Sequence, residues 1–275
     1  MNDSGATSVV DLHSHLVPGV DDGAPDLASV LDSIGRLVDL GVHRLITTPH
    51  IEGSRTHDPT ALEGRLSEVT SAWMTAAEAI ARDYPAVESL RGHEVMIDVP
   101  DPDLSDPRIR LAGTSFVLIE WPRLAIPPHT VTAIGRIRGQ GYRPIIAHPE
   151  RYYGILRSMP LVGRWREAGA YLQVNYGSLA GRYGSDPRMA AFELLRRGWV
   201  DYLSSDFHGR NRLKIYKKEA WAILEGLGAD GILQLACVTN PGRVLSDEDP
   251  FPVAPLEADR GLWARLKDML RLESA

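Results

Sequence analysis

Six short apolar runs in this chain each end in histidines or carboxylates, and this placement is the feature that most constrains the fold. The runs end at or just before His13 and His15, His50, Glu94, Glu120, His148, and Asp206 with His208. Buried parallel strands read as continuous apolar runs, and side chains at their carboxyl ends collect on one face of a sheet or barrel. The repetition therefore predicts one polynuclear metal centre in a parallel α/β fold.

The first pair, His13 and His15, has the spacing of a chelating site. The two residues follow the apolar run 9–12, and residues two apart in an extended chain point to the same side. A lone His-x-His is weak evidence, because surface histidine pairs occur by chance. The other five strand ends make metal binding the favoured interpretation.

Helical patterns alternate with these strands along the chain. Strands are predicted at 9–12, 42–48, 87–92, 116–120, 143–147, 170–175 and 200–204, and helices at 25–40, 59–82, 130–138 and 187–197, with more helix up to Leu272. Strands alternating with helices indicate a parallel α/β sheet. Because candidate ligands follow both the first and the last strand, the seven strands are expected to close into a barrel.

Length and composition fit one catalytic barrel domain at 9–275 after a short flexible N-terminus at 1–8. A chain of 275 residues is long enough for a single barrel, and its net charge of -6 gives no general affinity for nucleic acid. The only cysteine, Cys237, lies in an apolar run, so we expect a buried thiol and a reducing compartment. Neither a targeting segment nor a membrane-spanning run is evident, so the cytoplasm is the expected location and no membrane insertion is expected.

Six motifs occur in order over residues 9–245. They are His13-Ser14-His15, Pro18-Gly19-Val20-Asp21-Asp22-Gly23, Thr48-Pro49-His50, Ala147-His148-Pro149-Glu150-Arg151-Tyr152, the segment 173–181, and Ser204-Ser205-Asp206-Phe207-His208. Together these motifs resemble the polymerase-and-histidinol-phosphatase (PHP) superfamily. Within it they most resemble the manganese-dependent protein-tyrosine phosphatases of bacterial capsule and exopolysaccharide gene clusters.

This resemblance implies a distorted seven-stranded (β/α) TIM-like barrel with three divalent metal ions, Mn²⁺ before Fe²⁺, Zn²⁺, Co²⁺ or Mg²⁺. By position, His13 and His15 match ligands of one metal, and Asp206 matches a ligand near it. Glu120 and His148 match ligands of a second metal, and Glu94 matches a bridging carboxylate. Asp22, His50 and His208 match ligands of the third metal. Arg151 matches a phosphate-binding arginine. A second such arginine is implied after His208, and the spacing leaves Arg210 and Arg212 both open, with Arg212 taken as the candidate.

One departure from the family pattern concerns the loop after His50. Relatives often have a histidine or a basic residue there, whereas this chain has Ile51 and Glu52, with Arg55 further on. Substrate contacts on this loop therefore differ from the family pattern. The expected partner is a phosphotyrosine protein, such as an autophosphorylating tyrosine kinase of polysaccharide biosynthesis, and the oligomeric state is left open.

The residue chemistry supports phosphoester hydrolysis independently. Carboxylates mixed with imidazoles suit Mn²⁺, Fe²⁺ or Zn²⁺, and such ions activate water without a side-chain nucleophile. Four carboxylates, Asp22, Glu94, Glu120 and Asp206, leave three divalent ions with a net positive charge that attracts a dianion. Phosphotyrosine is plausible because its phenolate, with a parent pKa of about 10, leaves more readily than an alkoxide.

Three other functions stay open. Histidinol phosphate or another small phosphomonoester is the runner-up substrate on the same metal chemistry. An amidohydrolase also uses His-x-His in a barrel, but the chain offers no lysine at a middle strand end to bridge metals. A non-catalytic metal-binding regulator is the third class, and the full ligand set argues against it.

Several of these residues also have ordinary structural explanations. Asp21 and Asp22 fit a turn with a helix cap, and Arg151 fits a surface ion pair. His43, His57, His93 and His129 are expected to be structural or solvated, and Ser178 to shape its loop. Trp121, directly after Glu120, is expected to border the substrate pocket.

Overall fold

The computed structural model describes residues 8–257. Apart from Ser8, the predicted flexible N-terminus lies outside this range, and so does the part beyond residue 257 of the helical structure predicted up to Leu272. No helix among the described residues is long and apolar enough to cross a membrane.

The strands form two parallel sheets. One has the order β1-β2-β4, and the other has the order β3-β5-β6-β7-β8-β9. Their bounds are β1 Val9–Ser14, β2 Val42–Thr47, β3 His50–Glu52, β4 Glu88–Arg91, β5 Glu94–Met96, β6 Phe116–Glu120, β7 Arg143–Ala147, β8 Tyr171–Asn175 and β9 Tyr202–Ser204. The predicted parallel α/β fold is therefore confirmed.

The prediction of seven strands in one sheet is wrong. The part of the chain that the structure describes has nine strands in two sheets, because a further short strand follows each of the predicted strands 42–48 and 87–92. The chain leaves β2 at Thr48 and Pro49 and resumes as β3, and it leaves β4 at Gly92 and resumes as β5. Proline has no N–H to donate to a strand ladder. At Gly92 a Cβ would lie 3.0 Å from the Arg110 carbonyl oxygen, so the backbone there would have to shift to accept a side chain. The interruptions separate a three-stranded sheet from a six-stranded one.

The first and last strands lie side by side. Asp206 N donates to His13 O at 2.9 Å, and His15 N donates to Phe207 O at 2.8 Å. A parallel bridge joins Ser14 to Phe207. These bonds bring the two ends of the chain's strand series together, as the ligand pattern required.

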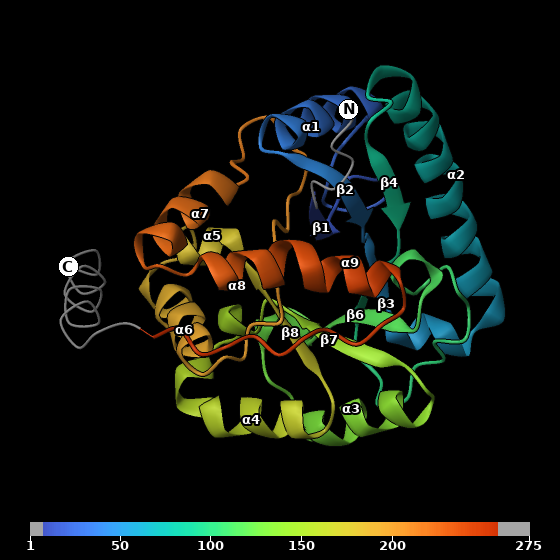
Figure 1. The fold of residues 1–275 in the computed structure, drawn as a ribbon. Helices are drawn as coiled ribbons and strands as arrows, with labels where there is room; N and C mark the ends of the chain where they lie inside the picture. The colour runs from blue at the N-terminus through green and yellow to red at the C-terminus, as the bar shows by residue number, and fades with distance from the viewer. Residues whose placement is uncertain (1–7, 258–275) are drawn as a thin grey trace.

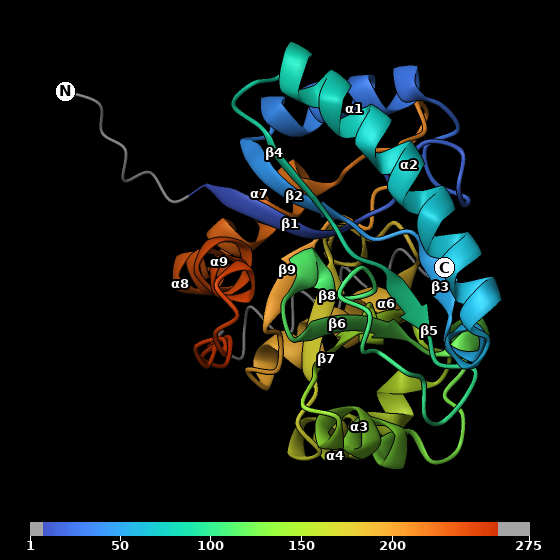
Figure 2. The same ribbon diagram turned by 90° about the vertical axis from the view of Figure 1, so that its right-hand side faces the viewer.

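Helices cover the outer faces of both sheets (Figures 1 and 2). Helices α1 and α2 lie on the three-stranded sheet, α3 and α4 lie under the six-stranded sheet, and α8 and α9 lie near β1 and β9 (Figures 1 and 2). Their bounds are α1 Leu27–Asp39, α2 Pro59–Asp83, α3 Thr130–Gly139, α4 Met159–Glu167, α5 Tyr176–Leu179, α6 Ser185–Arg196, α7 Lys217–Gly226, α8 Asp230–Gln234 and α9 Asn240–Leu245.

Local sequence signals set the ends of the first two helices. Asp26 caps α1 by accepting from Ser29 N at 2.8 Å, so α1 begins two residues later than the predicted Pro25. Asp58 caps α2 by accepting from Thr60 N and Ala61 N, and Pro59 stands in the first turn. Helix α1 is followed by Gly41 with φ +75, where glycine carries no steric penalty.

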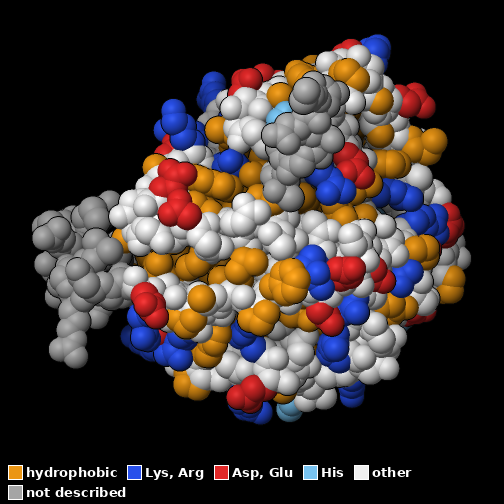
Figure 3. Space-filling view, viewed as in Figure 1, with side chains coloured by type: hydrophobic (Ala, Val, Ile, Leu, Met, Phe, Trp, Pro, Cys, Tyr) orange, Lys and Arg blue, Asp and Glu red, His pale blue; other side chains and the backbone are white. Residues whose placement is uncertain are grey.

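The surface carries charges of both signs. Figure 3 shows Lys, Arg, Asp and Glu side chains interspersed over one face, with apolar side chains between them. This distribution agrees with the modest net charge of -6 and gives that face no extended basic surface.

Candidate metal centre

The predicted ligands from separate strand ends lie together in one cluster. His13 belongs to β1 and His15 follows it, Glu120 ends β6, His148 follows β7, and Asp206 and His208 follow β9. His50 and Glu94 follow β2 and β4, as predicted, and each of them also begins a further short strand, β3 or β5. These two short strands pair in a register that sets His50 beside Glu94, and β5 pairs with β6 so that Met96 lies beside Glu120.

Glu94 is the central carboxylate of the cluster and is fully buried. Its Oε2 lies 3.2 Å from His13 Nε2, 3.3 Å from His15 Nε2 and 3.3 Å from His50 Nδ1, and its Oε1 lies 2.9 Å from His148 Nε2. Burial alone would raise the pKa of Glu94, but the surrounding imidazoles hold that pKa well below its usual value. Glu94 is therefore an anion placed where several nitrogen ligands meet.

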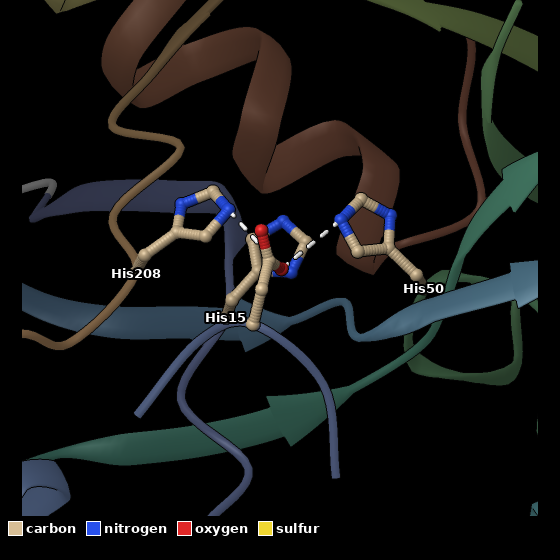
Figure 4. Close-up of side chains that lie close together, drawn as sticks. His15, His50 and His208 are labelled. Carbon is tan, nitrogen blue, oxygen red and sulfur yellow. Dashed lines mark ion pairs between the residues drawn. The ribbon is translucent and has the colours of Figure 1, made fainter. Parts of the chain in front are cut away.

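A second group of side chains surrounds Asp22. Asp22 Oδ1 lies 3.4 Å from His50 Nε2 and 3.6 Å from His208 Nε2. The His15 and His208 rings are stacked with centroids 4.2 Å apart, and Figure 4 shows the rings of His15, His50 and His208 converging from different parts of the chain.

Asp206 connects the histidines to a separate hydrogen-bond network. Its Oδ1 lies 3.5 Å from His13 Nε2 and 3.6 Å from His208 Nδ1. Its Oδ2 accepts from Arg151 Nη1 at 2.6 Å and from Asn175 Nδ2 at 2.8 Å. One carboxylate oxygen thus faces the imidazoles, and the other holds an arginine at the edge of the cluster.

Among the described residues, three sets of side chains offer ligand atoms within 4.8 Å of one another. They are His15, Asp22, His50 and His208; His13, His15 and Glu94; and His50, Glu94 and Glu120. Two sets share Glu94, which suits a bridging carboxylate. The grouping differs from the expected one, because Glu120 lies 3.3 Å from His50 while His148 contacts the other oxygen of Glu94.

The donor chemistry of the cluster fits divalent cations. Burial would lower the pKa of His15 and His50, but contacts with Asp21, Asp22, Glu94 and Glu120 raise these values to about 10 and about 11. His13 Nε2 and His15 Nε2 also approach to 3.2 Å. The site therefore favours positive charge where nitrogen and carboxylate ligands converge. A bound metal ion would supply this positive charge.

Two residues that orient the histidines were missed by the sequence analysis. Asp21 accepts from His15 Nδ1 at 2.8 Å and from His50 N at 3.2 Å. Gln173 Oε1 lies 2.8 Å from His13 Nδ1, and its Nε2 donates to Asn175 Oδ1 at 2.9 Å. Polar residues at alternate positions near the end of a buried strand were the available signal for Gln173 and Asn175. For Asp21 the only signal in the sequence was its position beside Asp22.

The arginines differ in their relation to the cluster. Arg151 contacts Asp206, as noted, and its side chain is 21% exposed. Arg210 donates from Nε and Nη2 to the carbonyl oxygen of Asp22, at 3.1 and 2.7 Å. Arg212 is exposed and makes no hydrogen bond or ion pair within the part of the chain that the structure describes. The geometry thus favours Arg210 over the predicted Arg212 as the arginine next to the site.

The expectation that Trp121 borders a substrate pocket is wrong. Trp121 is 1% exposed and packs against Trp165, with ring centroids 5.9 Å apart. Its backbone N donates to the hydroxyl of Tyr152 at 3.0 Å. Because Trp121 turns into the core after β6, it contributes packing beneath the site and no accessible surface.

Other residues predicted to stand outside the centre do so. His93 is buried and Nδ1 contacts the Arg108 carbonyl oxygen at 3.0 Å, while His57 and His129 are exposed. Ser178 donates to Glu150 at 2.6 Å, in agreement with a loop-shaping role. Cys237 is buried in a π-helical turn, and burial raises the pKa of its thiol to about 12.

The fold and the site together define a parallel α/β protein with a polynuclear centre of histidines and carboxylates. The chain belongs to the capsular polysaccharide synthesis CpsB/CapC family, whose model matches residues 9–246. This confirms the resemblance inferred from the motifs.

Named relatives and solved structures agree with this family. The tyrosine-protein phosphatase YwqE of Bacillus subtilis is 29% identical over 220 residues, which cover 79% of this chain and 84% of YwqE. The putative tyrosine-protein phosphatase CapC of Staphylococcus aureus is 25% identical over 202 residues, covering 73% and 77%.

Two solved structures resemble the fold. One, from a study of YwqE from Bacillus subtilis and CpsB from Streptococcus pneumoniae as metal-dependent tyrosine phosphatases, has a TM-score of 0.75 and 26% identity, covering 91% of this chain and 100% of that chain. A phosphotriesterase homology protein of Escherichia coli, solved with phosphate, has a TM-score of 0.50 and 14% identity, covering 86% and 98%. The latter likeness concerns the fold alone.

Proposed function

We propose that this protein is a metal-dependent protein-tyrosine phosphatase. The observation that carries the proposal is the convergence of His13, His15, His50 and His148 on buried Glu94, with Arg151 held at the edge of the same cluster. The names of YwqE and CapC as tyrosine-protein phosphatases support the substrate class.

The cofactors proposed are three divalent ions, with Mn²⁺ the preferred metal. The residues that would hold them are His13, His15, Asp22, His50, Glu94, Glu120, His148, Asp206 and His208. When bound, divalent ions polarise phosphoryl oxygens and make water more acidic. No side-chain nucleophile is required, and buried Cys237 is remote from this role because its thiol stays protonated near neutrality.

Arg151 is the proposed phosphate-binding residue of the chain. Its guanidinium has five N–H donors, of which Nη1 is bonded to Asp206, so further donors are available for phosphoryl oxygens. Asp206 orients this guanidinium and faces His13 with its other oxygen. Charge that develops on the phosphoryl group would then meet a donor that is already in place.

The biological setting proposed is the regulation of polysaccharide biosynthesis, with a phosphotyrosine protein such as an autophosphorylating tyrosine kinase as the partner. The family description of capsular polysaccharide synthesis supports this setting. We also take residues 9–275 as one catalytic domain and the two sheets as parts of one distorted barrel. The backbone bonds between β1 and the segment after β9 support the barrel.

A substrate panel tests the function. The purified chain is assayed with a phosphotyrosine peptide, a phosphoserine peptide and histidinol phosphate, each after chelator treatment and after Mn²⁺ addition. We expect phosphotyrosine hydrolysis that disappears with chelator and returns with Mn²⁺, because water activation depends on the ions. Preference for histidinol phosphate would support the runner-up substrate, and hydrolysis by metal-free protein would contradict the mechanism.

A further inference from the structure

The loop between α5 and α6 holds an arginine that has no carboxylate partner among residues 8–257. Arg182 is half-buried, and its guanidinium carbon lies 5.0 Å from the centroid of the Tyr183 ring and 5.7 Å from that of Tyr216. By contrast, Arg151 on the same Tyr183 ring, at 4.3 Å, is paired with Asp206. Arg182 therefore places an uncompensated positive charge beside the phosphate-binding arginine.

The position of Arg182 is built into the loop. Arg182 N donates to Gly177 O at 2.9 Å, and Gly181 and Gly184 on either side adopt φ +83 and φ +92. A Cβ on Gly177 would lie 3.1 Å from Tyr183 Cε2 and 3.2 Å from Arg182 Cδ. The absence of a side chain at Gly177 thus gives the Arg182 stem and the Tyr183 ring room to pack against α5.

The N–H groups of the Arg182 guanidinium have no hydrogen-bond or ion-pair partner among residues 8–257, and its ring contacts with Tyr183 and Tyr216 leave these donors available. A guanidinium that lies against an aromatic ring uses its flat face, whereas its N–H groups point outward in its own plane. These donors match the two oxygens of a carboxylate. An arginine held by two tyrosines also loses less conformational entropy when it binds than a free surface side chain.

A hollow lies next to Arg151, and Arg151 and Arg182 contact the same Tyr183 ring, although Arg182 does not itself line the hollow. A cavity of about 430 Å³ is lined by Glu150, Arg151, Tyr153, Arg157 and Asp186, among others. Asp186 belongs to the first turn of α6, directly after the loop that carries Arg182. Consecutive residues of an extended peptide are spaced at about 3.3–3.6 Å, so a neighbour one or two positions from the phosphorylated residue is within reach of Arg182.

We propose that Arg182 forms an anion subsite that binds the carboxylate of an acidic residue flanking the phosphotyrosine of the substrate. The proposal rests on the phosphatase function above and adds a sequence preference to it. Tyr183 then has two roles, since it packs against Arg151 on the phosphate side and against Arg182 on the peptide side. The subsite would select acidic peptide segments without taking part in bond cleavage.

Peptide binding tests this subsite separately from turnover. The full metal-loaded chain is titrated with labelled peptides that carry a non-hydrolysable phosphotyrosine mimic flanked by Asp, by Asn or by Lys, and Kd is measured by fluorescence anisotropy. We expect the Asp peptide to bind about tenfold more tightly than the Asn peptide, the scale of one partly exposed hydrogen bond between charged groups. Arg182→Ala should remove this difference, and Arg182→Glu should favour the Lys peptide. Arg136→Ala, at an exposed position of α3, is the matched control and should keep the preference of the parent.

Two outcomes overturn the subsite. Equal binding of the Asp and Asn peptides by the parent contradicts the subsite. It is also contradicted if Arg182→Ala weakens the binding of both peptides by the same factor, because that result assigns Arg182 to the support of Tyr183 alone. Turnover of p-nitrophenyl phosphate is measured in parallel. Metal-dependent turnover without a peptide preference leaves the phosphatase function standing, whereas a parent without turnover that still prefers the Asp peptide supports the subsite and contradicts the function.

Discussion

Asp21 offers the sharpest test of how the chain prepares its metal centre, because it contacts the ligands without being one of the proposed ligands. Its side chain is 4% exposed. Oδ2 accepts from His15 Nδ1 and His50 N, and Oδ1 accepts from Gly23 N at 2.9 Å. If His15 Nε2 binds a metal ion it carries no proton, so the proton of the neutral ring belongs on Nδ1, which lies 2.8 Å from Asp21 Oδ2. The perturbation is Asp21→Asn, which keeps the shape and removes one acceptor and the charge.

The magnitude follows from these three bonds. All three neighbours of Asp21 are donors, but an Asn side chain has one oxygen and one NH₂ group. In the less costly orientation the oxygen stays with His15 and His50, and the NH₂ group meets Gly23 N–H. One buried donor left without an acceptor costs about 1–3 kcal/mol. A neutral acceptor also makes His15 less basic, and loss of such a partner typically weakens metal binding by about 10–100-fold.

We therefore expect Asp21→Asn to raise the Kd for Mn²⁺ by about 10–100-fold, measured by competition with a fluorescent chelator. Asp39→Asn, at the exposed end of α1, removes the same charge far from these bonds and should bind Mn²⁺ like the parent. Circular dichroism checks that both variants are folded. A folded Asp21→Asn protein whose Kd stays within about twofold of the parent would refute the reasoning that this carboxylate prepares His15.

Two further variants test the reacting groups. Arg151→Ala should keep its metal content and lower kcat/KM for phosphotyrosine peptides by roughly 10²–10³. Arg151→Lys should have a kcat/KM between those of Arg151→Ala and the parent, since lysine restores the charge but not the fork of donors. An unchanged kcat/KM in Arg151→Ala would leave Arg151 as a structural partner of Asp206. Cys237→Ser should retain turnover, because burial raises the pKa of this thiol to about 12 and keeps it protonated; loss of turnover with metals still bound would indicate a cysteine nucleophile.

The long apolar strands were predictable from sequence because burial on both faces leaves a direct signal. The predicted bounds 116–120 and 143–147 coincide with β6 and β7, and both strands consist mainly of buried apolar residues. Helix α2 was also predicted closely, since Asp58 and Pro59 mark its start. Where local sequence and tertiary packing favour the same structure, the prediction holds.

The short strands β3 and β5 were not predictable by the same means. Each has three residues, and neither has an apolar run of its own. They exist because their neighbours pair with them: Glu94 N donates to the Thr48 and Pro49 carbonyl oxygens, and β5 pairs with β6. The sequence identified His50 and Glu94 as site residues, but only the tertiary pairing reveals that they lie side by side at the start of new strands.

His148 and Asp206 were identified as candidate ligands from the sequence, but the backbone conformation that positions their side chains could not be predicted from it. Both residues have positive φ, 35 and 50, although His148 directly follows β7 and Asp206 lies two residues after the end of β9. Such conformations cost about 1–3 kcal/mol each and persist only where the surroundings impose them. Here Arg151 N donates to His148 O, and Asp206 N donates to His13 O, both at 2.9 Å. With this backbone conformation the His148 imidazole contacts Glu94 and the Asp206 carboxylate contacts His13, so the two strained positions are also positions that supply side chains to the cluster.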